Sequence, residues 1–205
     1  MIAPLVQHPW QEIGHRLQAA CTAFDPALTG HHERVGAAAA DLARRLGLPK
    51  DQVARIHFAA GLHDLGKIGV PREVLHRKGR LNAEEMAVIR SHTEIGHRLL
   101  DGSAYPEIRC AAEVALSHHE FWAGGGYPRG LRGEAISLEA RVVAVADVFD
   151  ALRSERTYKA AWSDEQVIAE MTRESATHFD PAVFAVFLEA MAARPAEVAR
   201  CGQNA

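Results

Sequence analysis

Histidines and aspartates recur along this 205-residue chain in pairs and at helical spacings that suit metal binding. His63 and Asp64 are adjacent in GLHDLGKIGVP, at the end of an apolar segment. An imidazole nitrogen beside a carboxylate oxygen gives the mixed donor set that iron, manganese or zinc accepts. The alternative is that His-Asp is a frequent dipeptide without a special role. The pair becomes informative only if further donors lie near it in the fold.

Three more histidines could supply such donors. His92 lies within RSHTEIG, inside an expected helix and beside an apolar stripe, where a hydrogen-bonded structural histidine is the alternative. His118 and His119 end another expected helix. Because successive helical residues point about 100° apart, both can bind metal only if they serve different ions or if the helix end is distorted. The pair therefore favours a multinuclear site, with an exposed histidine pair as the alternative.

Asp147 is a carboxylate within VVAVADVFDAL, the most apolar helical segment of the chain. Burial of an unpaired carboxylate is costly, so a metal ion is its natural partner and a nearby Arg or Lys is the alternative. Asp150 follows one helical turn later. His31 and His32 open another helix in TGHHERV, where one of them could be a ligand and a capping or surface role is the alternative.

Helices must position these groups, because strand signals are nearly absent. Gly47 followed by Pro49 ends the first full helix, and Asn82 with Glu85 has the spacing of a capping box. The expected helices cover 32–46, 51–65 with Asp51 as its cap, 82–100, 106–120 and 138–152, with two more opened by Ser163 and by Pro181. IGVP at 68–71 could be extended. The pattern predicts an all-α bundle with two working loops, 66–81 and 121–137, and bundle cores are where di-metal sites are built.

Composition indicates a soluble globular protein, with 48% hydrophobic and 24% charged residues. A net charge of −3 gives no general attraction to DNA or to an anionic membrane, so neither is expected as a partner. The isolated cysteines favour a reducing compartment. No apolar run approaches the roughly 18 residues of a membrane span, and the N-terminal sequence is too polar for a signal peptide. We therefore expect a cytoplasmic location.

The motifs HHERV, HDLGKIGVP, KGRLNAEEMAVIRSH, HHEFWAGGGYPRG, ARVVAVADVFDALRSERTYK and THFDPAVF follow one another along the chain. In this order they resemble the HD-GYP family, the branch of HD-domain metal-dependent phosphohydrolases that degrades cyclic di-GMP. The resemblance runs from about Asp25 to Phe187, and GYP with RTYK is specific to this branch. It implies an all-α HD-domain helical bundle with a binuclear metal site in its core. The expected domain covers 25–194, between a helical extension at 1–24 and a tail at 195–205.

The resemblance also implies roles for individual residues. The implied metal ligands are His31, His63, Asp64, His92, His118, His119 and Asp147. Lys67 and Asp64 are the expected catalytic residues, with Lys67 beside the metals and the scissile phosphate. Gly126, Tyr127, Asp150, Arg156 and Lys159 are expected to contact the substrate. Two divalent ions, iron or manganese, would activate a bridging hydroxide that attacks phosphorus and gives pGpG and/or GMP.

Two departures from the family pattern qualify this reading. Some members carry a Glu where this chain has Ala27 and hold three metals, so two are expected here. Ala123-Gly124 stands where the family usually has Asp-Gly, which could change the loop and lower activity. Many members also have a receiver or other sensory domain before this one. With about 25 residues at that position, regulation is expected to come from a partner, such as a sensory protein or a diguanylate cyclase, or from a short N-terminal helix. A homodimer is a further expectation.

The sequence leaves three alternative functions open. The chain could be an HD-type phosphohydrolase acting on another nucleotide. It could be a degenerate module that binds cyclic di-GMP or a diguanylate cyclase without turnover. It could also be a structural helical protein whose histidines are incidental.

Overall fold

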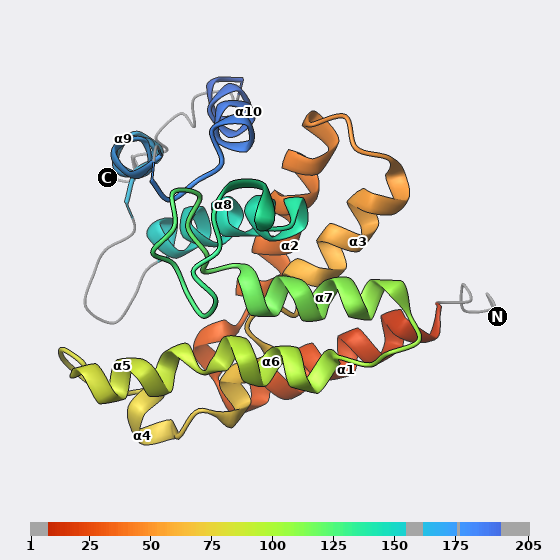
Figure 1. Ribbon diagram of the computed structural model, residues 1–205, viewed down its shortest axis with the longest axis vertical. Coiled ribbons are helices and arrows are strands. Elements are labelled where there is room, and N and C mark those ends of the chain that lie inside the picture. The colour runs from red at the N-terminus through yellow and green to blue at the C-terminus, as the bar shows by residue number, and fades with distance from the viewer. Residues whose placement is uncertain (1–7, 155–161, 176, 194–205) are drawn as a thin grey trace, which may run out of the picture.

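The computed structural model describes residues 8–154, 162–175 and 177–193, and within these ranges every regular element is a helix (Figure 1). This confirms the all-α prediction. The α-helices are α1 (Pro9–Phe24), α2 (His31–Arg45), α3 (Lys50–Ala60), α4 (Arg72–Leu75), α5 (Ala83–Arg90), α6 (His92–Leu100), α7 (Pro106–Ser117), α8 (Leu138–Arg153), α9 (Asp164–Glu174) and α10 (Pro181–Ala192). Short 3₁₀ helices are η1 (Pro26–Leu28), η2 (Leu65–Gly69) and η3 (Gly133–Ala135).

Several helix ends are those that the sequence predicts. The Asn82 side chain accepts a hydrogen bond from the backbone N–H of Glu85, which closes a capping box at the start of α5. Ser163 caps α9 in the same way. Proline begins α7 and α10. These caps satisfy backbone N–H groups that a helix start leaves without partners.

Two predicted helices differ from the structure. The helix expected over 51–65 ends at Ala60, with Asp51 in its first turn rather than at its cap, and His63 and Asp64 lie in the turn that leads into η2. The helix expected to reach Leu100 from Asn82 divides at Ser91, so His92 begins α6 rather than lying in a helix interior. The Ser91 hydroxyl donates to the Val88 carbonyl at 2.7 Å, a local bond that competes with the helical pattern.

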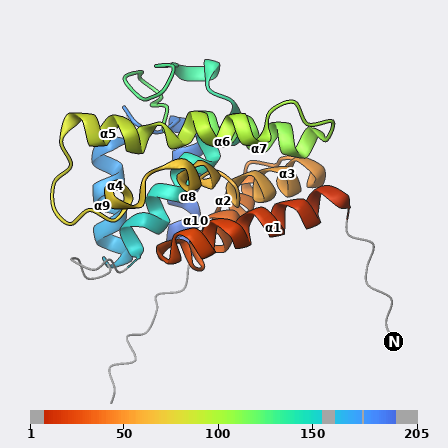
Figure 2. The same cartoon turned by 90° about the horizontal axis from the view of Figure 1, so that it is seen from below.

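The core is built where α2 packs on α3 and α8, and α6 packs on α7. Figures 1 and 2 show α5 and α6 almost in line beside α7, with α1 along the opposite side of the bundle in Figure 2. Val35, Ile56, Val114 and Val142 are fully buried between these helices. Burial of such side chains is the main favourable contribution to folding. Cys21 of α1 belongs to the same core and its thiol donates to the Leu65 carbonyl at 3.5 Å.

A close approach between η2 and α6 sets the position of the site. A Cβ on Gly66 would lie 1.8 Å from the His92 carbonyl oxygen and 2.5 Å from the Gly96 nitrogen. Only glycine fits there, because both neighbours are backbone atoms. The contact places Asp64 and Lys67, on either side of Gly66, against the first turn of α6.

No helix in the described part of the chain is both long enough and apolar enough to cross a membrane.

Candidate metal centre

All the predicted metal ligands come together in the interior of the bundle. Their donor atoms form three overlapping groups, each with all atoms within 4.8 Å of one another. The groups are His92, His118 and His119; His31, His63 and Asp64; and His63, His118 and Asp147. They come from the starts of α2 and α6, the turn after α3, the end of α7 and the middle of α8. Two groups share His63 and two share His118, as expected for neighbouring ion positions.

Three of these histidines are oriented by backbone carbonyl groups. The Nδ1 atoms lie 2.6 Å from the Ala60 oxygen in His63, 2.7 Å from the Ile89 oxygen in His92, and 3.1 Å from the Val114 oxygen in His118. Because a carbonyl only accepts, Nδ1 carries a proton and Nε2 is the atom left to bind a metal. This is how metal-binding histidines are normally held.

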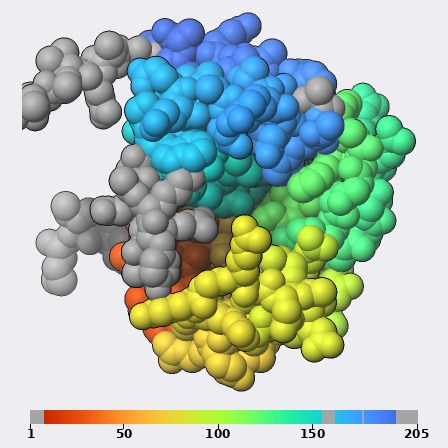
Figure 3. Space-filling view, turned by 90° about the vertical axis from the view of Figure 1, so that its left-hand side faces the viewer, coloured from red at the N-terminus to blue at the C-terminus, as the bar shows by residue number. Residues whose placement is uncertain are grey.

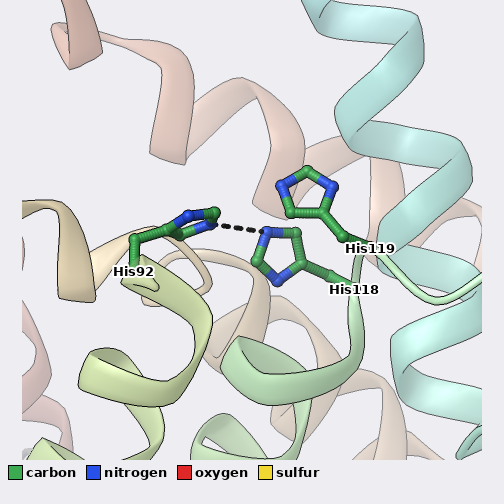
Figure 4. A group of neighbouring side chains, drawn as sticks. All are labelled: His92, His118 and His119. Atoms are coloured by element: carbon green, nitrogen blue, oxygen red, sulfur yellow. Dashed lines mark hydrogen bonds between the residues drawn. The ribbon is translucent and has the colours of Figure 1, made fainter. Parts of the chain in front are cut away.

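His118 and His119 lie beyond the last regular residue of α7, Ser117. Their ring centroids are 4.0 Å apart, and Figure 4 shows the His118 ring directed toward His92 from the end of the helix. The Nε2 atoms of His92 and His118 are 3.4 Å apart. Because the pair lies beyond the regular helix, both rings can belong to one donor group with His92.

The carboxylates of the site stay ionised despite burial. Burial would raise the pKa of Asp64, but Lys67 and His63 hold it well below its usual value. The His31 and His63 imidazoles, whose Nε2 atoms lie 3.4 and 3.6 Å from Asp147 Oδ1, do the same for the pKa of Asp147 against the effect of burial. Burial lowers the pKa of His119 to about 4, so its imidazole is neutral at pH 7. The site thus offers anionic oxygens from Asp64 and Asp147 and a neutral imidazole from His119.

The donor set fits a divalent ion. His63 is fully buried, and its inward Nε2 has no hydrogen-bond partner. That nitrogen lies 3.4 Å from Asp64 Oδ2 and 3.6 Å from Asp147 Oδ1. Burial lowers the pKa of His63, yet the two carboxylates outweigh burial and raise it to about 10. A cation among these atoms would replace that proton and satisfy all three groups.

Lys67 lies at the edge of this cluster. Its Nζ atom is 2.5 Å from Asp64 Oδ2. Burial lowers the pKa of Lys67, but the Asp64 carboxylate raises it above the ordinary value, so the side chain stays cationic. A fixed positive charge therefore stands beside the predicted metal ligands.

The loop that contains Gly126, Tyr127 and Pro128, here called the GYP loop, packs against His119. A Cβ on Gly126 would lie 2.5 Å from the His119 carbonyl oxygen and 2.4 Å from the Phe121 nitrogen, so glycine is required for the loop to fold back. The Tyr127 ring stacks on the His119 ring with centroids 4.8 Å apart, and the Tyr127 N–H donates to the His119 carbonyl at 3.2 Å. In this arrangement Gly126 and Tyr127 hold His119 in place. Their contact with substrate stays a prediction.

Sequence reasoning missed two residues of this region. Glu120 is 2% exposed, and its carboxylate accepts hydrogen bonds from the backbone N–H groups of Arg129 at 2.7 Å and Leu131 at 2.9 Å. Its place directly after the histidine pair was the available signal. The Arg90 guanidinium lies 4.9 Å from the centroid of the Tyr127 ring, and nothing in the local sequence points to that contact.

Ala123, which stands where the family usually has Asp, lies against the segment that begins at Thr177. The Ala123 N–H donates to the Thr177 carbonyl at 2.9 Å, and the Trp122 N–H donates to the His178 carbonyl at 3.0 Å. These bonds dock the loop on the THFD segment through backbone atoms. The face that Figure 3 presents is hollowed between the yellow α5 side and the blue α9 side.

Of the remaining residues predicted to contact the substrate, the structure describes Asp150 alone. Asp150 is 7% exposed, and its carboxylate contacts His31 Nδ1 at 2.8 Å and the Arg34 guanidinium at 2.6 Å. These contacts favour a positioning role for Asp150. Arg156 and Lys159 lie outside the described residues.

The fold and the motifs have known counterparts. A crystal structure of a cyclic GMP-AMP specific phosphodiesterase of V. cholerae, V-cGAP3, superposes on 89% of this chain and 48% of that one, with a TM-score of 0.64 and 19% identity. The sequence model of the HD domain matches residues 20–183. The chain belongs to the HD domain family. This confirms the resemblance that the ordered motifs predict.

Relatives of this HD domain have longer chains. The cyclic di-GMP phosphodiesterase response regulator RpfG of Xanthomonas campestris pv. campestris is 45% identical over 176 residues, which is 86% of this chain and 47% of that protein. The 3′3′-cGAMP-specific phosphodiesterase 2 of Vibrio cholerae is 37% identical over 179 residues, which is 87% of this chain and 34% of that protein. The chain thus spans about half or less of the length of these relatives.

Proposed function

We propose that this HD domain is a metal-dependent phosphodiesterase that hydrolyses cyclic di-GMP to pGpG and/or GMP. The observation that carries the proposal is that the histidines and aspartates form three overlapping donor groups. Two of these groups include His63, whose Nε2 lacks a hydrogen-bond partner. The 45% identity to a cyclic di-GMP phosphodiesterase supports the choice of substrate.

The proposed cofactors are two divalent ions, iron or manganese. One would be held by His31, His63 and Asp64, the other by His92, His118 and His119, with Asp147 close to both His63 and His118. Mixed imidazole and carboxylate donors suit these metals. When bound, the ions supply an acidified water and a clamp for a phosphate oxygen.

The protein side chains contribute charge and position. Lys67 stabilises the negative charge that develops on the phosphoryl group, because its ammonium is fixed beside Asp64. Tyr127 and Gly126 shape the wall of the pocket next to His119. Arg156 and Lys159 bind the second phosphate, for which arginine offers two parallel hydrogen bonds.

A second substrate has a specific observation in its favour. The 37% identical relative from Vibrio cholerae is specific for 3′3′-cGAMP. We therefore propose that the two cyclic dinucleotides be compared on one preparation, with cyclic di-GMP expected to be cleaved faster. Preferential cleavage of 3′3′-cGAMP would leave the phosphodiesterase assignment intact and change the substrate.

The decisive experiment measures metal content and cyclic di-GMP cleavage on the same anaerobic preparation. We expect close to two iron or manganese ions per chain, with cleavage to pGpG or GMP. Asp64→Ala removes a carboxylate from the centre of the site and should abolish both metal and turnover. Turnover that persists in this variant would refute the assignment, and a metal-loaded chain that binds cyclic di-GMP without cleaving it would make the domain a binding module.

Four further proposals concern the domain bounds, the location, the regulation and the oligomeric state. We propose that the domain covers 25–194 and that it acts in the cytoplasm. We also propose regulation by a partner protein, such as a sensory or receiver protein or a diguanylate cyclase, and a homodimer is a further expectation. Size-exclusion chromatography with light scattering tests the homodimer.

A further inference from the structure

Arg34 binds Asp150 through one edge of its guanidinium, with two hydrogen bonds. Arg34 Nε donates to Asp150 Oδ1 at 2.6 Å, and Nη2 donates to Asp150 Oδ2 at 2.9 Å and to the Ser154 hydroxyl at 3.1 Å. Paired bonds of this kind fix the orientation of a carboxylate as well as its charge. Asp150 is thus held in one orientation.

The carboxylate passes this constraint to a predicted metal ligand. Asp150 Oδ2 lies 2.8 Å from His31 Nδ1, and on the far side of the same ring Nε2 lies 3.4 Å from Asp147 Oδ1. Because the carboxylate accepts a hydrogen bond from the Nδ1–H group, Nε2 of His31 is directed toward the metal centre. His63, His92 and His118 are instead oriented by backbone carbonyl groups close to them in sequence. The ring of His31 depends on a side chain from α8, which can move.

The surroundings of Asp150 give it room to move if Arg34 is lost. The pair lines a cavity of about 550 Å³ between α2, α8 and α10, together with Phe149 and Ser154. The Arg34 side chain is 51% exposed, whereas that of Asp150 is 9% exposed. Removal of the guanidinium would let water reach the carboxylate, which would then have an alternative partner to His31.

We propose that Arg34 is a positioning residue of the metal centre, which sets the ring of His31 through Asp150. The inference rests on the proposed metal-dependent function. It assigns the effect to the ion held by His31, His63 and Asp64. The group of His92, His118 and His119 has no member in contact with Arg34 or Asp150 among the contacts of the described residues.

The test is an anaerobic Mn²⁺ titration of Arg34→Ala followed by electron paramagnetic resonance, which separates one bound ion from a coupled pair. We expect one ion to bind as in the wild type and the other about 10–100-fold more weakly, the range found when a group behind a metal ligand is removed. Arg45→Ala is the matched control. Arg45 lies on α2, lines the same cavity and pairs with Asp41, so its loss should leave both ions in place.

Two further measurements separate positioning from a general structural role. Millimolar guanidinium should restore the second ion to Arg34→Ala, because the cavity gives it access to Asp150, whereas it should not change Arg45→Ala. Arg34→Lys keeps the charge without the paired bonds and should recover only part of the affinity. In a double-mutant cycle with Asp150→Asn, the loss of metal affinity in the double variant should not exceed the larger of the two single-variant losses.

The outcomes are distinct. Two ions bound to Arg34→Ala with wild-type affinity would overturn the inference, as would equal weakening of both ions or strictly additive losses in the cycle. A wild-type chain that binds no metal would instead refute the proposed function, and this inference with it. A wild type that holds two ions and cleaves substrate, beside an unaffected Arg34→Ala, would refute the role of Arg34 alone.

Discussion

A single methyl group at Gly66 should uncouple η2 from α6. The Cβ of an alanine there would lie 1.8 Å from the His92 carbonyl oxygen, 2.5 Å from the Gly96 nitrogen and 2.8 Å from the His92 carbonyl carbon. All three are backbone atoms, so no side-chain rotation relieves the overlap. The helix that begins with His92 must therefore move away from the turn that carries Asp64.

The size of the displacement follows from these contacts. The distance to the His92 oxygen must grow from 1.8 Å to at least 3.0 Å, which is a shift of 1.2 Å. Metal–ligand distances tolerate only about 0.2 Å, so the shift is several times what the site can absorb. Insertion of a methyl group into a packed interior costs about 1–3 kcal/mol, and we expect the upper end because the backbone must move.

The assay is urea denaturation of metal-free Gly66→Ala, paired with metal analysis of the reconstituted protein. We expect a loss of about 3 kcal/mol in the free energy of unfolding and a loss of the ion assigned to His92. Gly69→Ala is the control, since the three atoms nearest its Cβ would all belong to the Ile95 side chain, the closest at 2.9 Å, and none to the backbone. Wild-type stability and two bound ions in Gly66→Ala would refute the reasoning.

Three further predictions concern the loop, the lysine and pH. Gly126→Ala should push the GYP loop away from His119 and weaken metal binding at that residue while circular dichroism still shows the fold; unchanged metal affinity would contradict this. Lys67→Ala should retain both ions and lower the rate of cleavage, so full activity would show that the lysine is not catalytic. Burial lowers the pKa of His32 to about 3 and that of His119 to about 4 in the folded chain, against an ordinary value of 6.5. Below pH 6.5 these histidines bind protons in the unfolded chain but not in the folded chain, so the stability of the metal-free protein should fall as pH decreases from 6.5 to about 4. Denaturation midpoints that stay constant over this pH range would disprove the prediction.

The sequence by itself determined the all-α class, several helix starts and the chemical character of the site. The capping pairs at Asn82 and Ser163 and the proline at Pro181 act over three or four residues, so they can be read directly from neighbours in the chain. Local sequence also marked candidate donors, such as an aspartate in an apolar helix and adjacent histidines, whereas the full ligand set was implied by the resemblance of the ordered motifs to the HD-GYP family. These signals are local, and the structure agrees with them.

Only the tertiary structure decided how the donors are held. Arg34 and Asp150 are 116 residues apart, and they meet because α2 packs on α8. The fit of Gly66 against His92 likewise depends on how closely two backbones approach, which no helical periodicity encodes. Contacts of this kind join residues from different elements, so their geometry follows from the packing of the whole bundle rather than from any short stretch of sequence.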